Sequence, residues 1–62
     1  MFEELINKKI KCVWKDGDNS KGIYGIVENI DKLFISIRGE QDYSLIHISI
    51  KDVIMIKEVK NG

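Results

Sequence analysis

The sequence has no proline, one cysteine, one histidine and no surplus of either charge. The single cysteine, Cys12, excludes an internal disulfide, and Cys12 with His47 gives too few ligands for a structural zinc site. Ten basic and ten acidic side chains leave a formal charge of zero, which argues against a non-specific nucleic-acid binder. No apolar run approaches the roughly 20 residues of a membrane span. We therefore expect no metal, no cofactor and no membrane partner.

The chain has 62 residues, close to the lower limit for a domain that folds alone. Folding at this size buries only about 60% of the surface of the unfolded chain, so small domains usually need disulfides, a metal or oligomerisation. The chain has 44% hydrophobic residues and can form neither an internal disulfide nor a structural zinc site, so its composition predicts self-association. An unpaired cysteine is typical of a reducing compartment, and residues 1–4 are unlike a signal peptide. We expect a single cytoplasmic domain over residues 1–62.

Residues 44–56 have the clearest hydrophobic pattern. Ile46, Ile48 and Ile50 alternate with the period of a half-buried strand, whereas residues 53–56 are apolar on both faces. A strand that is apolar on both faces must be covered on both, and so short a chain has little other protein to cover it. The pattern predicts that a second copy does so. The strand edges expected to meet between copies carry Tyr43, Leu45, Val53 and Met55.

Turn signals divide the rest of the chain into short elements. Apolar spacing over residues 2–7 predicts one or two helical turns that cover an open end of the fold. Residues 16–20 predict a hairpin loop longer than two residues, and Gly25 predicts a bulge or a sharp bend in its strand. Residues 50–52 predict a corner of one 3₁₀ turn. The expected strands cover residues 9–15, 22–31, 33–38, 43–50 and 53–59.

Five short strands joined by tight turns favour a mainly β fold, a strongly bent antiparallel barrel of the SH3-like kind with a short N-terminal helix. Alternation predicts the inward side chains of the first and third strands to be Ile10, Cys12, Trp14, Leu33, Ile35 and Ile37. The outward side chains of the third strand are then Phe34, Ser36 and Arg38. An OB fold is the alternative, but it needs longer strands and usually a helix between the third and fourth.

Three segments resemble a known family. Residues 5–10 (Leu-Ile-Asn-Lys-Lys-Ile) are similar to its passage from helix to first strand, and residues 14–17 (Trp-Lys-Asp-Gly) are similar to its first hairpin. Residues 25–31 match its first motif, a glycine with an aliphatic residue two positions later and an aspartate six positions later. Together with the order of elements, these segments resemble the Sm-like family, which includes Sm, LSm and Hfq proteins. The resemblance covers nearly the whole chain and implies a ring-forming barrel of the kind that binds RNA in this family.

The chain departs from that family at its RNA-binding motifs. In Sm and LSm proteins a loop ending in Met-Asn follows the motif aspartate, and the asparagine helps to hold a base; here residues 32–34 (Lys-Leu-Phe) follow Asp31. Residues 48–52 (Ile-Ser-Ile-Lys-Asp) replace the second motif, Ile-Arg-Gly, and the Ile-Arg-Gly at 37–39 precedes the fourth strand instead. A further departure is a loop insertion of about three residues around residues 18–21. The resemblance therefore implies the barrel and its edges, but not the RNA pocket.

Candidate RNA contacts come from charged and aromatic side chains near these motifs. An exposed aromatic residue beside a cation can stack on a base, and a histidine can stack or donate. The candidate RNA-binding residues are Asp31, Lys32, Phe34, Arg38, His47 and Lys51. Four lysines near the first strand, Lys8, Lys9, Lys11 and Lys15, could contact phosphates, although such a row is ordinarily a solvated outer face. Asp31 could equally cap its own turn.

No residues form a catalytic constellation, because one histidine, one cysteine and no suitably spaced acids leave no nucleophile with an activating base. We expect no enzymatic activity. The first hypothesis is a homo-oligomeric Sm-like module that binds RNA; the alternative is an SH3-like protein-interaction module, a subunit or adaptor that binds no nucleic acid. Self-pairing favours the first, whereas neutral charge and the missing asparagine favour the second. Neutral charge also argues against a third hypothesis, a small DNA-binding regulator.

Overall fold

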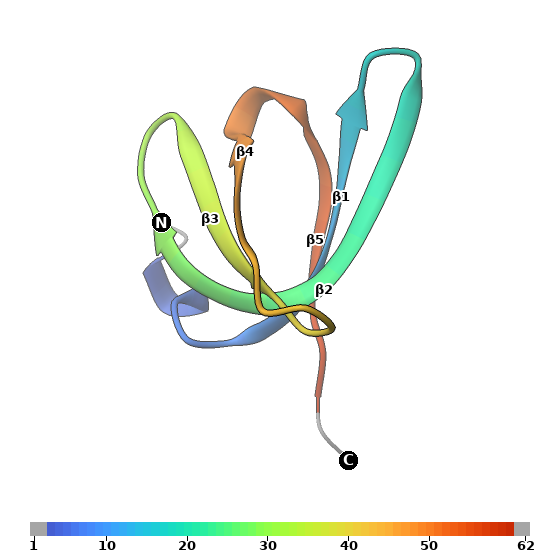
Figure 1. The fold of residues 1–62 in the computed structure, drawn as a ribbon. Coiled ribbons are helices and arrows are strands. Elements are labelled where there is room, and N and C mark those ends of the chain that lie inside the picture. The colour runs from blue at the N-terminus through green and yellow to red at the C-terminus, as the bar shows by residue number, and fades with distance from the viewer. Residues whose placement is uncertain (1–2, 61–62) are drawn as a thin grey trace.

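A computed structural model describes residues 3–60. The elements in chain order are η1 (Glu3–Leu5), β1 (Lys9–Asp16), β2 (Asn19–Ile30), β3 (Phe34–Gly39), β4 (Leu45–Ser49), η2 (Ile50–Asp52) and β5 (Val53–Glu58) (Figure 1). The five strands form one antiparallel sheet in the order β4-β3-β2-β1-β5. The predicted mainly β class with five antiparallel strands and the 3₁₀ corner are therefore confirmed. Closure of this sheet into a barrel stays a prediction, since β4 and β5 are the edges of the described sheet.

The longest strand, β2, curves along its whole length between β1 and β3 (Figure 1). Gly25 lies in the middle of β2, paired with Ile10 on one side and Gly39 on the other. The expected irregularity is present, but the shift in register with β3 lies between Val27 and Asn29 and not at Gly25. Gly25 serves close packing instead, because β3 approaches it too closely to leave room for a side chain.

The first hairpin is tighter than predicted. Asp16 pairs with Asn19, so that only Gly17 and Asp18 form the turn, and Gly17 has a φ of 64°. Lys21 Nζ lies 2.9 Å from Asp16 Oδ2 beside it. The prediction of a longer loop was wrong because the polar residues after the turn already belong to the ladder. Small polar residues signal a turn, but they do not show where pairing resumes.

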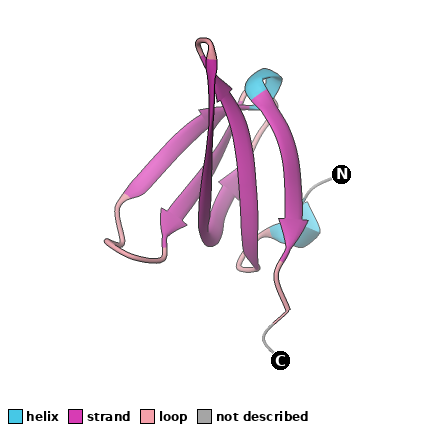
Figure 2. Ribbon diagram, turned by 90° about the vertical axis from the view of Figure 1, so that its right-hand side faces the viewer, coloured by secondary structure: helices cyan, strands magenta, loops and turns pink. Residues whose placement is uncertain are grey.

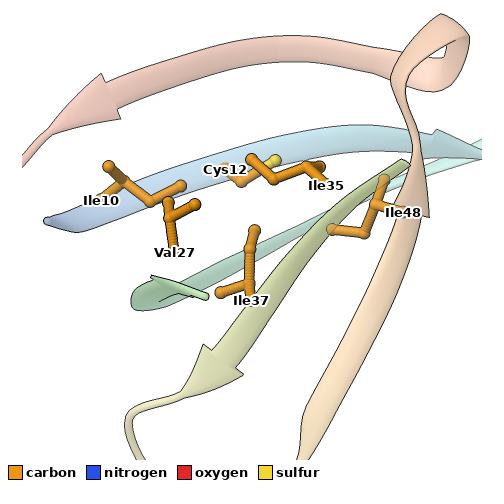
Figure 3. Packing of buried hydrophobic residues seen from close by; sticks show 6 residues of the cluster. All are labelled: Ile10, Cys12, Val27, Ile35, Ile37 and Ile48. Atoms are coloured by element: carbon orange, nitrogen blue, oxygen red, sulfur yellow. The ribbon is translucent and has the colours of Figure 1, made fainter. Parts of the chain in front are cut away.

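The core lies on one face of the sheet and consists of the buried side chains of Ile10, Cys12, Val27, Ile35, Ile37 and Ile48 (Figure 3). Leu5 and Ile6 of the η1 segment pack against it, as does Trp14. Phe2, which was expected to share the helical stripe, lies outside the described residues. Leu33 was predicted to point inward, but it is 69% exposed because it lies in the turn before β3 begins. The two short helices lie at opposite ends of the sheet (Figure 2).

The apolar run at the end of the chain is divided by a bulge. Val53 pairs with Trp14 and Met55 with Val13, which leaves Ile54 as the extra residue of β5. Ile54 is 60% exposed, whereas Val53 and Ile56 pack against the core. The strand predicted over residues 43–50 begins only at Leu45. Tyr43 has a φ of 59° and so cannot continue an extended strand.

Candidate functional site

The outer edge of β5 can be traced from its hydrogen bonds to β1. Val59 N donates to the Lys9 carbonyl oxygen at 2.9 Å, in the same register that pairs Lys11 with Lys57. Hydrogen-bonded and non-hydrogen-bonded pairs alternate in an antiparallel ladder. The backbone groups of Ile56 and Glu58 therefore point away from β1, towards the free edge.

The same reasoning applies to β4. Gly39 N donates to the Ser44 carbonyl oxygen, and Ile50 N donates to the Leu33 carbonyl oxygen, both at 2.9 Å. By alternation, the backbone groups of three β4 residues point away from β3 and form the other free edge. These residues are Leu45, His47 and Ser49.

The four side chains predicted at a copy-to-copy interface lie in different surroundings. Leu45 is 39% exposed and belongs to the free edge of β4. Met55 is on the outer face of β5, opposite Val13, and Val53 packs against the core. Tyr43 lies in the turn before β4, where its carbonyl oxygen accepts a hydrogen bond from Arg38 Nη1 at 3.0 Å. Sequence analysis did not single out Ile54, the most exposed apolar side chain of β5.

Four of the six candidate RNA-binding residues lie at the end of the sheet where the β2–β3 turn meets η2. The Ile50 N to Leu33 O hydrogen bond joins the two segments, which places Asp31, Lys32 and Phe34 near Lys51. Asp31 Oδ1 accepts hydrogen bonds from the backbone N–H groups of Phe34 and Leu33, both at 2.8 Å. These bonds lower the pKa of the Asp31 carboxyl. Asp31 therefore holds the turn in shape, as in the capping role weighed above.

The other two candidates already have partners within the chain, but only Arg38 lies away from this end, because His47 is two residues from Ser49, the partner of Phe34. His47 is opposite Ser36, and its Nδ1 lies 2.6 Å from the Ser36 hydroxyl oxygen, within hydrogen-bond distance. Arg38 Nε donates to Glu28 Oε2 at 3.2 Å, and Arg38 pairs with Leu45 at the opposite end of β3 from Phe34. The six residues thus do not form one site, because Arg38 lies apart from the other five.

The outer face of β2, β1 and β5 holds a group of residues that sequence analysis did not bring together. Tyr24, Lys11 and Lys57 form one row across the three strands, and Lys11 Nζ lies 5.3 Å from the centroid of the Tyr24 ring. Alternation in β1 gave the position of Lys11, but the imperfect phase of β2 left that of Tyr24 undecided. Only the pairing register shows that the two are neighbours.

Within residues 3–60 no metal site can be identified. No group of three or more histidine, cysteine, aspartate or glutamate side chains lies close enough together there to hold a metal ion. Cys12 is buried, and burial raises the pKa of its thiol, so the reactive thiolate is disfavoured. The helices of this described part are also too short to cross a membrane.

Comparisons with known proteins return no relative: no family model, no curated protein and no solved structure matches the chain. Function is therefore inferred from the geometry of the chain itself.

Proposed function

We propose that this chain is a non-enzymatic, homo-oligomeric Sm-like module in which β4 of one copy pairs with β5 of the next. The observation that carries the proposal is the order of the sheet, which leaves these two strands as its edges. Unpaired edge strands are usually protected by charged residues or proline. The residues of β4, Leu45–Ser49, include neither.

Pairing two different edges makes a head-to-tail contact, which closes into a ring when the rotation between copies allows it. The backbone groups of His47 on one copy and Ile56 on the next would then find partners. Pairing would also cover the exposed side chains of Leu45 and Ile54, which a monomer leaves in water. In this proposal each bent sheet forms an SH3-like barrel of the Sm-like kind.

The RNA-binding part of the proposal rests on the end of the sheet where the β2–β3 turn meets η2. Phe34 is 46% exposed there and could stack on a base, while Lys32 and Lys51 could contact phosphates. Asp31 contributes by holding the turn. Repetition around a ring would place several such ends on one face, so that weak contacts add through multivalency.

A proline substitution tests the assembly. Glu58→Pro removes a backbone N–H that points to the free edge but leaves the hydrogen bonds to β1 in place. Glu58→Ala is the matched control, because it removes the same side chain and keeps the N–H. In sedimentation velocity we expect the wild-type chain and Glu58→Ala to assemble and Glu58→Pro to sediment as a monomer with an unchanged circular dichroism spectrum. A monomeric wild-type chain would contradict the proposal.

RNA binding is tested separately, by the fluorescence anisotropy of labelled U-rich and A-rich RNA at low salt. We expect Lys32→Glu and Lys51→Glu to weaken binding, whereas Lys60→Glu, beyond the end of β5 that lies away from η2, should leave it unchanged. Absence of binding to either RNA would remove this part of the proposal and leave the assembly standing.

The internal hydrogen bonds of Asp31, Arg38 and His47 favour a second candidate, an SH3-like subunit or adaptor that binds protein and no nucleic acid. This candidate would be supported if the chain binds neither the U-rich nor the A-rich RNA but does bind a purified partner protein, whether the chain is assembled or monomeric.

A further inference from the structure

Two hollows lie side by side on the outer face of the sheet and share Lys11 and Tyr24 in their walls. One, of about 490 Å³, extends from these residues to the β3–β4 turn at Glu40 and Asp42. The other, of about 600 Å³, extends across β5 to Lys57 and Lys60. The two hollows adjoin at these shared residues, and we refer to them together as the outer-face groove.

The floor of the groove is apolar and aromatic. Tyr24 is 47% exposed and Met55 is 39% exposed, and Val59 adds to the lining at the β5 end. A tyrosine ring offers a large contact area at little cost in conformational entropy, which makes it a frequent anchor in recognition sites. Because Lys11 Nζ lies over the Tyr24 ring, an apolar side chain of a ligand would pack against the part of the ring that stays exposed and against Met55.

The two ends of the groove have opposite charge. At the β5 end, Lys11, Lys57 and Lys60 face one acid, Glu58. At the turn end the charged lining besides Lys11 is Glu40 and Asp42. Lys9 Nζ lies 2.6 Å from Glu40 Oε1, so that Asp42 is the acid left without a basic partner among the described residues. The hydrogen bonds that Ser44 donates to Asp42 lower the pKa of its carboxyl and so favour the ionised form.

This polarity distinguishes between two kinds of ligand. A nucleic-acid strand has a uniformly negative backbone and would bring phosphates against Asp42 at one end. A peptide can have opposite charges at its two ends. Lys57 pairs with Lys11 in the sheet, so that both lysines would attract an acidic group of a ligand at the β5 end.

We propose that the outer-face groove binds a peptide segment of another protein, with a basic residue, an apolar residue and an acidic residue in that spatial order. The acidic residue lies against Lys57 and Lys60, the apolar residue on Tyr24, and the basic residue against Asp42. This site uses side chains of the outer face, whereas assembly uses backbone edges, so it does not depend on the proposed function.

Selection from a random decapeptide library displayed on phage tests the proposal with the intact chain as bait. We expect the enriched peptides to share the order of basic, apolar and acidic residues. A labelled synthetic peptide of the enriched sequence is then titrated by fluorescence anisotropy. Tyr24→Ala and Lys57→Glu should each weaken its binding by about tenfold or more, whereas the control Lys15→Glu should leave it unchanged.

Charge reversal separates a direct contact from a structural effect. A peptide whose acidic residue is changed to lysine should bind Lys57→Glu better than it binds the wild-type chain. Three results would overturn the proposal: no enriched peptide, enriched peptides without the charge order, or binding that Tyr24→Ala leaves unchanged. The proposal would also be overturned if a single-stranded oligonucleotide displaces the peptide and binds more tightly than it through Tyr24. The groove would then be a nucleic-acid site.

Discussion

Gly25 lies so close to Arg38 that no side chain fits between them. A Cβ at position 25 would be 2.3 Å from the Arg38 carbonyl oxygen and 2.7 Å from Ile37 Cγ2. The first of these contacts is with backbone, which cannot turn aside as a flexible side chain would. The close approach of β3 to β2 thus requires a residue without a side chain at this position.

Gly25→Ala should destabilise the chain by about 3 kcal/mol or prevent folding, because overpacking against backbone can be relieved only by moving β3. Gly22→Ala is the matched control in the same strand, since its Cβ would lie 3.6 Å from Val13 Cγ2, an ordinary contact. We expect Gly22→Ala to stay within about 0.5 kcal/mol of the wild-type chain. Urea denaturation measures both. Equal effects of the two substitutions would contradict the assigned role of Gly25.

Lys57→Glu should stabilise the fold by about 0.2–1 kcal/mol, because it replaces like charges on paired residues of β1 and β5 with opposite charges. Thermal unfolding at low salt measures the gain, which should shrink in concentrated salt as the charges are screened. Lys15→Glu, opposite Ser20, should give no such gain. A loss of stability in Lys57→Glu would show that Lys11 and Lys57 do not oppose each other as described.

Acid should weaken the fold through Asp31. Backbone hydrogen bonds lower the pKa of its carboxyl in the folded chain, so the ionised form contributes stability. That contribution is complete above the unfolded-state pKa, about 3.9, and is lost as the pH falls through the lower folded-state pKa. Asp31→Asn keeps an acceptor oxygen but has no charge. Its melting temperature should be below that of the wild-type chain at neutral pH and should approach it in acid; a constant difference across pH would contradict the assignment.

Ser36 and His47 should be energetically coupled across β3 and β4. Their side chains face each other in a pair without backbone hydrogen bonds, where cross-strand side chains lie closest. A double-mutant cycle with Ser36→Ala and His47→Ala should give a coupling free energy of about 1 kcal/mol. Additive single substitutions would show that this contact contributes nothing to stability.

Alternating hydrophobicity predicted much of this fold, because every second side chain of a strand points to the same face, and the buried face is therefore apolar at every second residue. It placed Ile10, Cys12, Ile35 and Ile37 in the core. It could not place Ile54, since a bulge arises from the pairing of two strands and not from the pattern of one. For the same reason, only the pairing register of β1 with β2 shows that Tyr24 and Lys11 are neighbours. Arg38 lies apart from the other candidate RNA-binding residues and is held by Glu28 and Tyr43. Closeness in the sequence could not predict this, because it determines neither the geometry of a turn nor the hydrogen-bond partners of a side chain.

Amide hydrogen exchange of residues on the two sides of β5 tests the central claim, the pairing of β4 with β5 between copies, most directly. The amides of Lys57 and Val59 point towards β1 and should be protected whether or not the chain assembles. Those of Ile56 on β5 and His47 on β4 point to the free edges and should become protected as the protein concentration rises. If the Ile56 and His47 amides exchange as freely as solvent-exposed groups at every concentration while Lys57 stays protected, the edges remain open and the proposed assembly is wrong.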